Sequence, residues 1–146
     1  MQIKVKTLKE GLKAPQYKTD GASGFDFEAC LSEDVVLMPC RSVLIPTGLV
    51  FEIPFGYELQ VRSRSGLALD SGVIVLNSPG TVDSDYRGEV KVILFNSSDK
   101  SLTIRNGDRI AQGVICKVER CEFRISDELS HTQRQSAGFG STKIRG

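Results

Sequence analysis

Three short stretches of the sequence contain the side chains that phosphate chemistry uses. The first, residues 62–66, reads Arg-Ser-Arg-Ser-Gly and places two guanidinium groups and two hydroxyls beside a flexible glycine. Guanidinium groups bind phosphate oxygens through paired, charge-assisted hydrogen bonds, so this stretch suits a polyphosphate. An exposed polar turn explains the same residue types equally well.

The second stretch, residues 80–88, reads Gly-Thr-Val-Asp-Ser-Asp-Tyr-Arg-Gly and separates two apolar runs, residues 73–76 and 90–94. This pattern predicts the tip of a hairpin. Asp83 and Asp85, beside Tyr86, can bind a metal, supply a general base or only cap the turn. Composition alone favours capping, because Asp and Gly are ordinary turn residues.

The third stretch, residues 134–142, reads Arg-Gln-Ser-Ala-Gly-Phe-Gly-Ser-Thr and adds more hydrogen-bond donors. It matches neither the phosphate-binding P-loop nor the glycine pattern of dinucleotide-binding folds. A terminus of small polar residues is commonly disordered. A phenylalanine between two glycines instead suggests a ring that closes on a flat ligand, with the glycines allowing close backbone approach.

Length and charge narrow the class of protein. The chain has 146 residues, the usual size of one domain, and we expect a β domain over residues 1–133 with residues 134–146 as its C-terminal arm. A net charge of +1 gives no broad positive field, so we expect no nucleic acid and no membrane partner. No apolar run of membrane-spanning length or signal-peptide core occurs, which predicts a cytoplasmic protein.

The cysteines and the single histidine offer little catalytic chemistry. Cys30, Cys40, Cys116 and Cys121 form no Cys-x-x-Cys pair, and we interpret them as reduced, small apolar residues rather than as a zinc site or a redox pair. His131 stands alone near the end of the chain, where an exposed tail residue is the simplest interpretation. One isolated histidine also disfavours most nucleophilic triads.

The elements that must position these stretches are short strands. Most segments between the glycines and prolines alternate apolar and polar residues, which predicts an all-β sandwich or jelly roll. The clearest run is Tyr57-Glu-Leu-Gln-Val-Arg, and Asn106-Gly107 suits a type I′ turn with positive φ at both residues. We expect strands at residues 3–6, 42–45, 49–53, 57–62, 72–76, 90–95, 102–105 and 110–118.

The segment from residue 114 to residue 137 is ambiguous. It contains no Gly or Pro, and Val114, Val118, Cys121, Ile125 and Leu129 fit one face of a helix. The alternation of Cys121, Phe123 and Ile125 fits a strand. We favour the strand, because regularly spaced short strands make a mixed fold less consistent.

Five ordered motifs of the chain resemble those of the trimeric dUTP pyrophosphatases, across nearly its whole length. The first spans residues 22–29 and includes Asp26, the second is Arg64-Ser65-Gly66, the third spans residues 77–88, the fourth spans residues 109–112, and the fifth spans residues 134–142. The resemblance implies a jelly-roll subunit in a homotrimer with three active sites, each assembled from all three chains. The implied reaction is hydrolysis of dUTP to dUMP and pyrophosphate, which limits uracil incorporation into DNA and supplies dUMP.

The resemblance also implies roles for single residues near the reacting phosphorus. Asp83 would be the general base for the water that attacks the α-phosphorus. Tyr86 would stack on the deoxyribose and exclude a 2′-hydroxyl. Asp26 would contact waters on a Mg²⁺ ion that the three phosphates chelate. The implied phosphate-binding residues are Arg64, Ser65, Gly66 and Gln112.

The remaining implied residues recognise the base and the γ-phosphate. The uracil edge would be read in the hairpin by Asn77 and by backbone groups around Gly80, Thr81, Val82 and Lys91. Phe139, flanked by Gly138 and Gly140, would cover the uracil. The γ-phosphate would be held by Arg134, Ser141 and Thr142.

The chain departs from the family pattern at a few positions. Gln135, Ala137 and Lys143 replace glycines in the fifth motif, which stiffens the arm, and Phe27 stands where leucine is usual. Asp85 and Glu89 are interpreted as turn and strand-surface residues, and Arg109 as serving the fold or a subunit contact. The competing functions are a dCTP deaminase of the same fold and a nucleotide-binding or protein-binding relative without catalysis.

Overall fold

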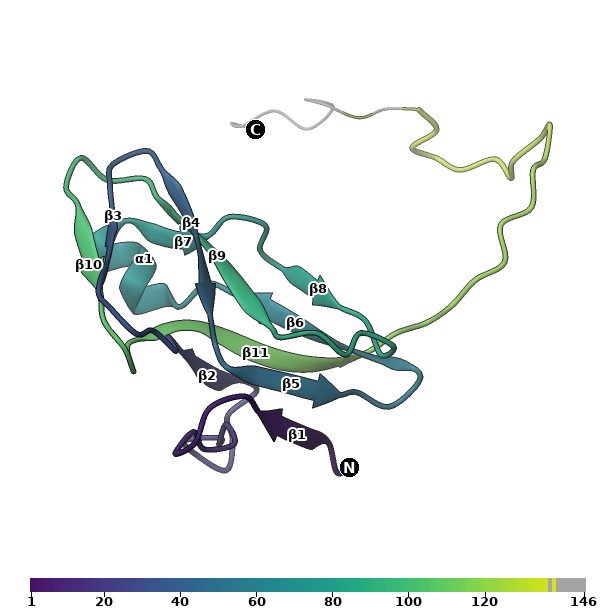
Figure 1. The fold of residues 1–146 in the computed structure, drawn as a ribbon. Helices are drawn as coiled ribbons and strands as arrows, with labels where there is room; N and C mark the ends of the chain where they lie inside the picture. Colours follow the sequence, from purple (N-terminus) through teal and green to yellow (C-terminus); the bar gives the residue numbers. More distant parts are fainter. Residues whose placement is uncertain (137, 139–146) are drawn as a thin grey trace.

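A computed structural model describes residues 1–136 and 138 of the chain (Figure 1). In this part of the chain nearly all regular structure is β, so the all-β prediction is confirmed. None of its helices is long and apolar enough to cross a membrane. The elements are β1 (Lys4–Thr7), β2 (Phe25–Glu28), β3 (Val35–Leu37), β4 (Ser42–Pro46), β5 (Leu49–Glu52), β6 (Tyr57–Arg62), α1 (Ser65–Ser71), β7 (Val73–Val75), β8 (Gly80–Val82), β9 (Lys91–Asn96), β10 (Leu102–Ile104) and β11 (Arg109–Lys117).

All strand pairs are antiparallel, and they form two main sheets with two smaller pairs. One main sheet has the order β2-β11-β6-β8 and the other has the order β4-β9-β7, while β1 pairs with β5 and β3 with β10. Buried residues from both main sheets, such as Leu59 and Val61 of β6 and Val92 and Leu94 of β9, belong to one hydrophobic cluster. The core therefore lies between the sheets, as the alternating pattern predicts.

The strands expected from the strongest alternation are all present, within one or two residues of their predicted ends. The sequence did not indicate β2, β3 and β8, which have only three or four residues each. Such short segments carry too few side chains to establish a period of two. Their pairing partners, which lie far away along the chain, hold them in the sheets.

Aromatic side chains of β2 and β5 form the part of the core beneath the first motif. Phe27 is fully buried, and its ring lies edge-on to Phe25 and Phe51 with centroid separations of 5.4 and 6.0 Å. A Cβ on Gly113 would lie 2.6 Å from the Phe25 ring and 2.9 Å from that of Phe27, so glycine makes room for both. Because side chains alternate along a strand, burial of these two rings directs Asp26 away from the core.

The sequence patterns predicted strands and turns only, so they did not predict the helix α1, which begins at Ser65. It follows β6 directly and ends at Gly72, whose φ of 65° is in the left-handed region and whose N–H bonds to the carbonyl of Ala68 at 3.1 Å. Glycine adopts this conformation without a Cβ penalty, so it ends the helix efficiently. None of the seven helical residues is buried, which explains the absence of a clear helical period in the sequence.

Two predictions about turns need correction. The prediction of a type I′ turn is wrong, because Gly107 has a φ of 85° whereas Asn106 has no positive φ. With the Asp108 N–H bonded to the Arg105 carbonyl at 3.1 Å, this pattern is that of a type II turn. The predicted hairpin tip is partly right: β7 and β9 pair, but Gly80–Val82 leaves this sheet and pairs with β6.

The predicted strand beyond residue 117 is wrong. β11 ends at Lys117, opposite Tyr57 at the start of β6, and the described residues after it form neither strand nor helix. Phe123 and Ile125 are more than nine-tenths exposed. Figure 1 shows this segment running away from the sheets, and no strand of the described part pairs with it. Alternation alone cannot form a strand without a hydrogen-bonding neighbour.

Candidate active site

The segment that runs from β8 to β9 borders a pocket lined by many of the residues predicted to recognise a base and a sugar. Its volume is about 420 Å³. Strand β8 and the turn after it supply one side, and β4 and β9 supply the other. The lining residues are Leu44, Thr81, Val82, Asp83, Tyr86, Glu89, Val90 and Lys91, so five of the predicted site residues meet here.

The turn itself is held by backbone and by side chains other than its carboxylates. The Tyr86 N–H bonds to the Asp83 carbonyl at 3.2 Å, and Arg87 donates to the carbonyl of Ser84 at 2.7 Å. In the described part of the chain, neither the Asp83 nor the Asp85 carboxylate accepts a hydrogen bond or joins an ion pair. The interpretation of these carboxylates as turn caps is therefore wrong. Asp83 faces solvent at the pocket with its acceptor oxygens available to a ligand or a water.

Asn77 lies next to the start of β8 rather than in the lining of the pocket. Its Nδ2 atom is 3.0 Å from the position that a Cβ on the buried Gly80 would occupy. Glycine at position 80 therefore allows the amide group of Asn77 to pack directly on the backbone that enters the pocket. Asn77 and Gly80 therefore lie next to each other at the start of β8, the strand whose backbone is predicted to recognise the uracil edge.

A second group of predicted residues gathers where β2, β11 and the end of β6 lie side by side. Arg64 Nε donates to Asp26 Oδ1 at 2.9 Å, and Arg64 Nη1 donates to the carbonyl of Arg109 at 3.0 Å. Arg109 Nη1 reaches the other oxygen of Asp26 at 3.3 Å. The Arg64 and Asp26 side chains are 26% and 17% exposed, so this pair is partly shielded from water.

Strand register brings Gln112 to the same place. Gln112 lies opposite Asp26 on one side of β11 and opposite Arg62 on the other. Its Nε2 donates to the carbonyl of Ser63 at 2.9 Å, which ties β11 to the loop before α1. The second motif, residues 64–66, and the fourth motif, residues 109–112, therefore lie close together within one chain. Residues predicted to bind the same phosphates are expected to do so.

Ser65 and Gly66 begin α1 and are exposed. A Cβ placed on Gly66 would have no atom within 4 Å, and Gly66 has no positive φ. Packing and backbone conformation in this chain therefore do not require glycine at position 66.

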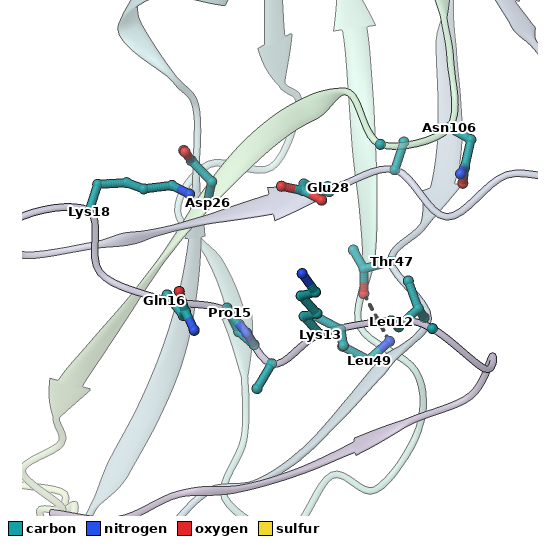
Figure 2. Close-up of a pocket in the computed structure, with 14 residues that line it drawn as sticks. Leu12, Lys13, Pro15, Gln16, Lys18, Asp26, Glu28, Thr47, Leu49 and Asn106 are labelled. Atoms are coloured by element: carbon teal, nitrogen blue, oxygen red, sulfur yellow. Dashed lines mark hydrogen bonds between the residues drawn. The ribbon is translucent and has the colours of Figure 1, made fainter.

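The two groups do not share a pocket within one chain. Arg64 borders a separate hollow of about 330 Å³ between α1, β10 and β11. Asp26 borders a third hollow of about 460 Å³ beneath the loop of residues 11–18, and Figure 2 shows Lys18 and Asp26 at the same end of it. Neither hollow includes Asp83 or Tyr86.

The predicted arm lies partly outside the described residues. Arg134 is exposed, and a Cβ on Gly138 would contact nothing within 4 Å. The described arm runs far from the sheets (Figure 1). The other predicted arm residues, which are Phe139, Gly140, Ser141 and Thr142, lie outside the described part, as do Ala137 and Lys143.

The described residues include no cluster of three or more His, Cys, Asp or Glu side chains that could hold a metal by themselves. Cys30 is buried, Cys116 is partly buried, and Cys40 and Cys121 are exposed thiols, so the interpretation as apolar residues suits only the first two. His131 is exposed, as predicted. Asp26 is the carboxylate that pairs with Arg64, and a single carboxylate fits only an ion whose other ligands come with the substrate.

The sequence did not reveal that Arg109 and Glu89 hold other residues of the site in place. Arg109 joins the Asp26 pair, and Glu89 accepts a hydrogen bond from the Gly48 N–H at 2.8 Å and pairs with Lys91 at 3.6 Å. The contacts of Arg109 with Asp26 and of Glu89 with Gly48 join segments that are distant in the sequence. No local pattern in one sequence indicates such a contact.

Comparison with known proteins finds relatives that match this chain over nearly its whole length. The family profile described as dUTPase matches residues 10–143. Deoxyuridine 5′-triphosphate nucleotidohydrolase of Hydrogenobaculum sp. is 54% identical over 99% of this chain and 100% of its own length. The enzyme of the same name from Treponema denticola is 55% identical over 94% of this chain and 95% of its own length.

Solved structures show the same fold. The dUTPase of Staphylococcus bacteriophage 80alpha, determined with dUPNHPP, has a TM-score of 0.84 at 24% identity over 98% of this chain and 99% of its own. A variant dUTPase of S. aureus phage phi11, determined with a structural Mg(II) ion, has a TM-score of 0.80 at 22% identity over 90% of this chain and 100% of its own. The predicted jelly-roll fold is thus confirmed.

Proposed function

Because this chain belongs to the dUTPase family, we propose that it hydrolyses dUTP to dUMP and pyrophosphate with Asp83 as the general base. The observation that carries the proposal is the free Asp83 carboxylate at the edge of a pocket that also presents the Tyr86 ring. Water attacks the α-phosphorus as its proton passes to Asp83. The bond from this phosphorus to the bridging oxygen breaks, and pyrophosphate leaves.

A carboxylate is an adequate base for this step. General-base help from a positioned side chain contributes about 10²- to 10⁴-fold, and the charge that develops on pyrophosphate is stabilised by converging donors. Asp83 has no competing partner in the described chain, so both of its oxygens can orient the water. No histidine is required.

Arg64 is oriented for phosphate before substrate arrives. Asp26 and the carbonyl of Arg109 use two of its N–H donors, and three of the five donors of a guanidinium group remain. Ser65 and Gly66 follow it on the exposed start of α1, and Gln112 lies on the neighbouring strand. Together they bind the phosphate chain.

We propose that three chains share each active site. The described lining of the Asp83 pocket contains no arginine, and the Arg64 group contains none of the residues proposed to bind the base, so each group lacks what the other provides. A homotrimer joins the Asp83 pocket of one chain to the Arg64 group of a second. The arm of a third chain then brings Arg134, Gly138, Phe139, Gly140, Ser141 and Thr142 over the uracil and the γ-phosphate.

A Mg²⁺ ion held by the three phosphates would neutralise charge on the leaving pyrophosphate. Asp26 fits its predicted contact with the waters of such an ion. Each carboxylate oxygen accepts one arginine donor and keeps a second acceptor position. Arg64 and Arg109 hold this carboxylate in place.

We assign the selection of the substrate to the Asp83 pocket and the start of β8. The Tyr86 ring, 47% exposed at the pocket, stacks on the deoxyribose and leaves no room for a 2′-hydroxyl. Asn77 and the backbone of Gly80, Thr81, Val82 and Lys91 read the uracil edge, and the slot excludes the methyl group of thymine. The cytoplasm remains the expected location.

The role of Asp83 is tested by Asp83→Asn, with Asp85→Asn as a matched control two positions away on the same turn. We expect the first variant to bind dUTP but to lose about 10²- to 10⁴-fold in kcat. The control should turn over normally, since the Asp85 carboxylate also lacks a partner in the described chain. Near-normal kcat for Asp83→Asn would contradict the assignment.

A further inference from the structure

The Tyr86 ring lies directly on the backbone of Gly88. A Cβ built on Gly88 would be 2.3 Å from Tyr86 Oη, 2.4 Å from Cζ and 2.9 Å from Cε2. All three atoms belong to the same phenol group, and Gly88 has no positive φ that would itself require glycine. The contact with Tyr86 therefore explains the glycine.

The Tyr86 side chain also forms a hydrogen bond with the backbone. Its hydroxyl donates to the carbonyl of Glu89 at 3.2 Å. Gly88 therefore supports the outer end of the ring, and Glu89 holds the hydroxyl there. The two contacts fix both where the ring lies and how far it projects into the pocket.

This backbone is anchored to the rest of the fold. Glu89 Oε1 accepts from the Gly48 N–H at 2.8 Å, and the Val90 N–H bonds to the carbonyl of Leu49 at 2.9 Å. The buried Thr47 hydroxyl donates to the carbonyl of Val90 at 2.6 Å. The segment that supports Tyr86 is thus tied to the turn between β4 and β5.

We propose that Gly88 is a positioning residue that sets the selectivity for a 2′-deoxy sugar by fixing the Tyr86 ring. This inference rests on the proposed function, in which that ring lies against the sugar. Ordinary contact begins at 3.4 Å, so an alanine at position 88 forces ring atoms now 2.4 Å from the new Cβ to move by about 1 Å.

The displacement should change selectivity more than folding. The clashing atoms are the far end of a side chain that is 47% exposed, so the ring can swing outward without moving the core. A misplacement of about 1 Å in a binding group costs up to about 10²-fold in rate. We therefore expect Gly88→Ala to lower the ratio of kcat/KM for dUTP to that for UTP by roughly 10- to 100-fold.

The experiment compares Gly88→Ala, Tyr86→Ala, the double variant and a control, Gly21→Ala, with the unmodified protein. Gly21 is exposed, has no positive φ and has no atom within 4 Å of an added Cβ. Both kcat/KM values and the thermal midpoint are measured for each. We expect both single variants at positions 86 and 88 to lose selectivity, the double variant to match Tyr86→Ala, and the control to remain unchanged.

Two results would overturn the inference. One is an unchanged selectivity ratio in Gly88→Ala, and the other is a further loss when Gly88→Ala is added to Tyr86→Ala. If Gly88→Ala does not fold, the double variant must fold, because the clashing ring is absent; its failure to fold also overturns the inference. An unmodified protein that does not cleave dUTP, or that does not prefer it to UTP, contradicts the proposed function instead.

Discussion

Asp26 and Arg64, 38 positions apart in the sequence, form an ion pair with 2.9 Å between Oδ1 and Nε. Asp26 is placed by the burial of Phe25 and Phe27 on either side of it, and Arg64 is placed by the end of β6. Arg109 contacts the second Asp26 oxygen. The aromatic core beneath β2 thus determines the direction of Arg64, the arginine that we propose binds phosphate.

Asp26→Asn should reduce kcat/KM for dUTP by about 10- to 100-fold. A hydrogen bond to a charged group contributes about 1.5–3 kcal/mol, and the neutral amide holds Arg64 less firmly. Steady-state kinetics at saturating Mg²⁺ measure the effect. In an Arg64→Ala background the loss should be much smaller, because the arginine that Asp26 orients is absent.

The matched control is Asp34→Asn, which removes the carboxylate of the Asp34–Arg105 ion pair. That pair is 56% and 68% exposed with 3.5 Å between its atoms, so its contribution is small. Activity should remain normal. An equal loss from Asp34→Asn, or full activity of Asp26→Asn, would show that the Asp26 pair does not orient Arg64 for the reaction.

Phe27→Ala should lower the free energy of unfolding by about 3–5 kcal/mol, because it removes a fully buried ring and leaves a cavity. Phe27→Leu, the residue usual in the family at this position, should cost less than about 1.5 kcal/mol. Thermal unfolding at one fixed protein concentration compares the two. Similar losses from Leu and Ala would mean that ring packing against Phe25 and Phe51 contributes little.

A chain that ends at Gln133 should lose most of its dUTP hydrolysis and keep its thermal midpoint. The described residues after Lys117 form neither strand nor helix, and large apolar side chains among them are exposed, so removing the arm leaves the core intact. A chain that ends at Thr142 retains every arm residue with an assigned role and serves as the control. Full activity of the shorter chain would rule out the arm's role.

The sequence predicted those parts of the fold in which local pattern and final environment agree. Tyr57–Arg62 alternates over six residues, and its buried Leu59 and Val61 face the core as expected. The short strands Val35–Leu37 and Gly80–Val82 depend on distant partners and could not be predicted from their own residues. The alternation of Cys121, Phe123 and Ile125 indicated a strand, yet no strand among the described residues pairs with this segment.

The candidate site was predictable in residue type but not in arrangement. The motifs identified Asp83, Tyr86 and Arg64, and the structure places the first two at one pocket and the third elsewhere. The bond from the Gly48 N–H to Glu89 and the contact of Tyr86 with Gly88 depend on packing. Such contacts arise when the sheets form, so one sequence does not reveal them.

The central claim is tested most directly by measuring pyrophosphate and ammonia release from dUTP, UTP, dTTP and dCTP, each with and without Mg²⁺. The Asp83 pocket and the Arg64 group predict rapid pyrophosphate release from dUTP with Mg²⁺, and little from the other three nucleotides. They predict no ammonia from dCTP. Ammonia from dCTP, or equal cleavage of all four nucleotides, would contradict the account.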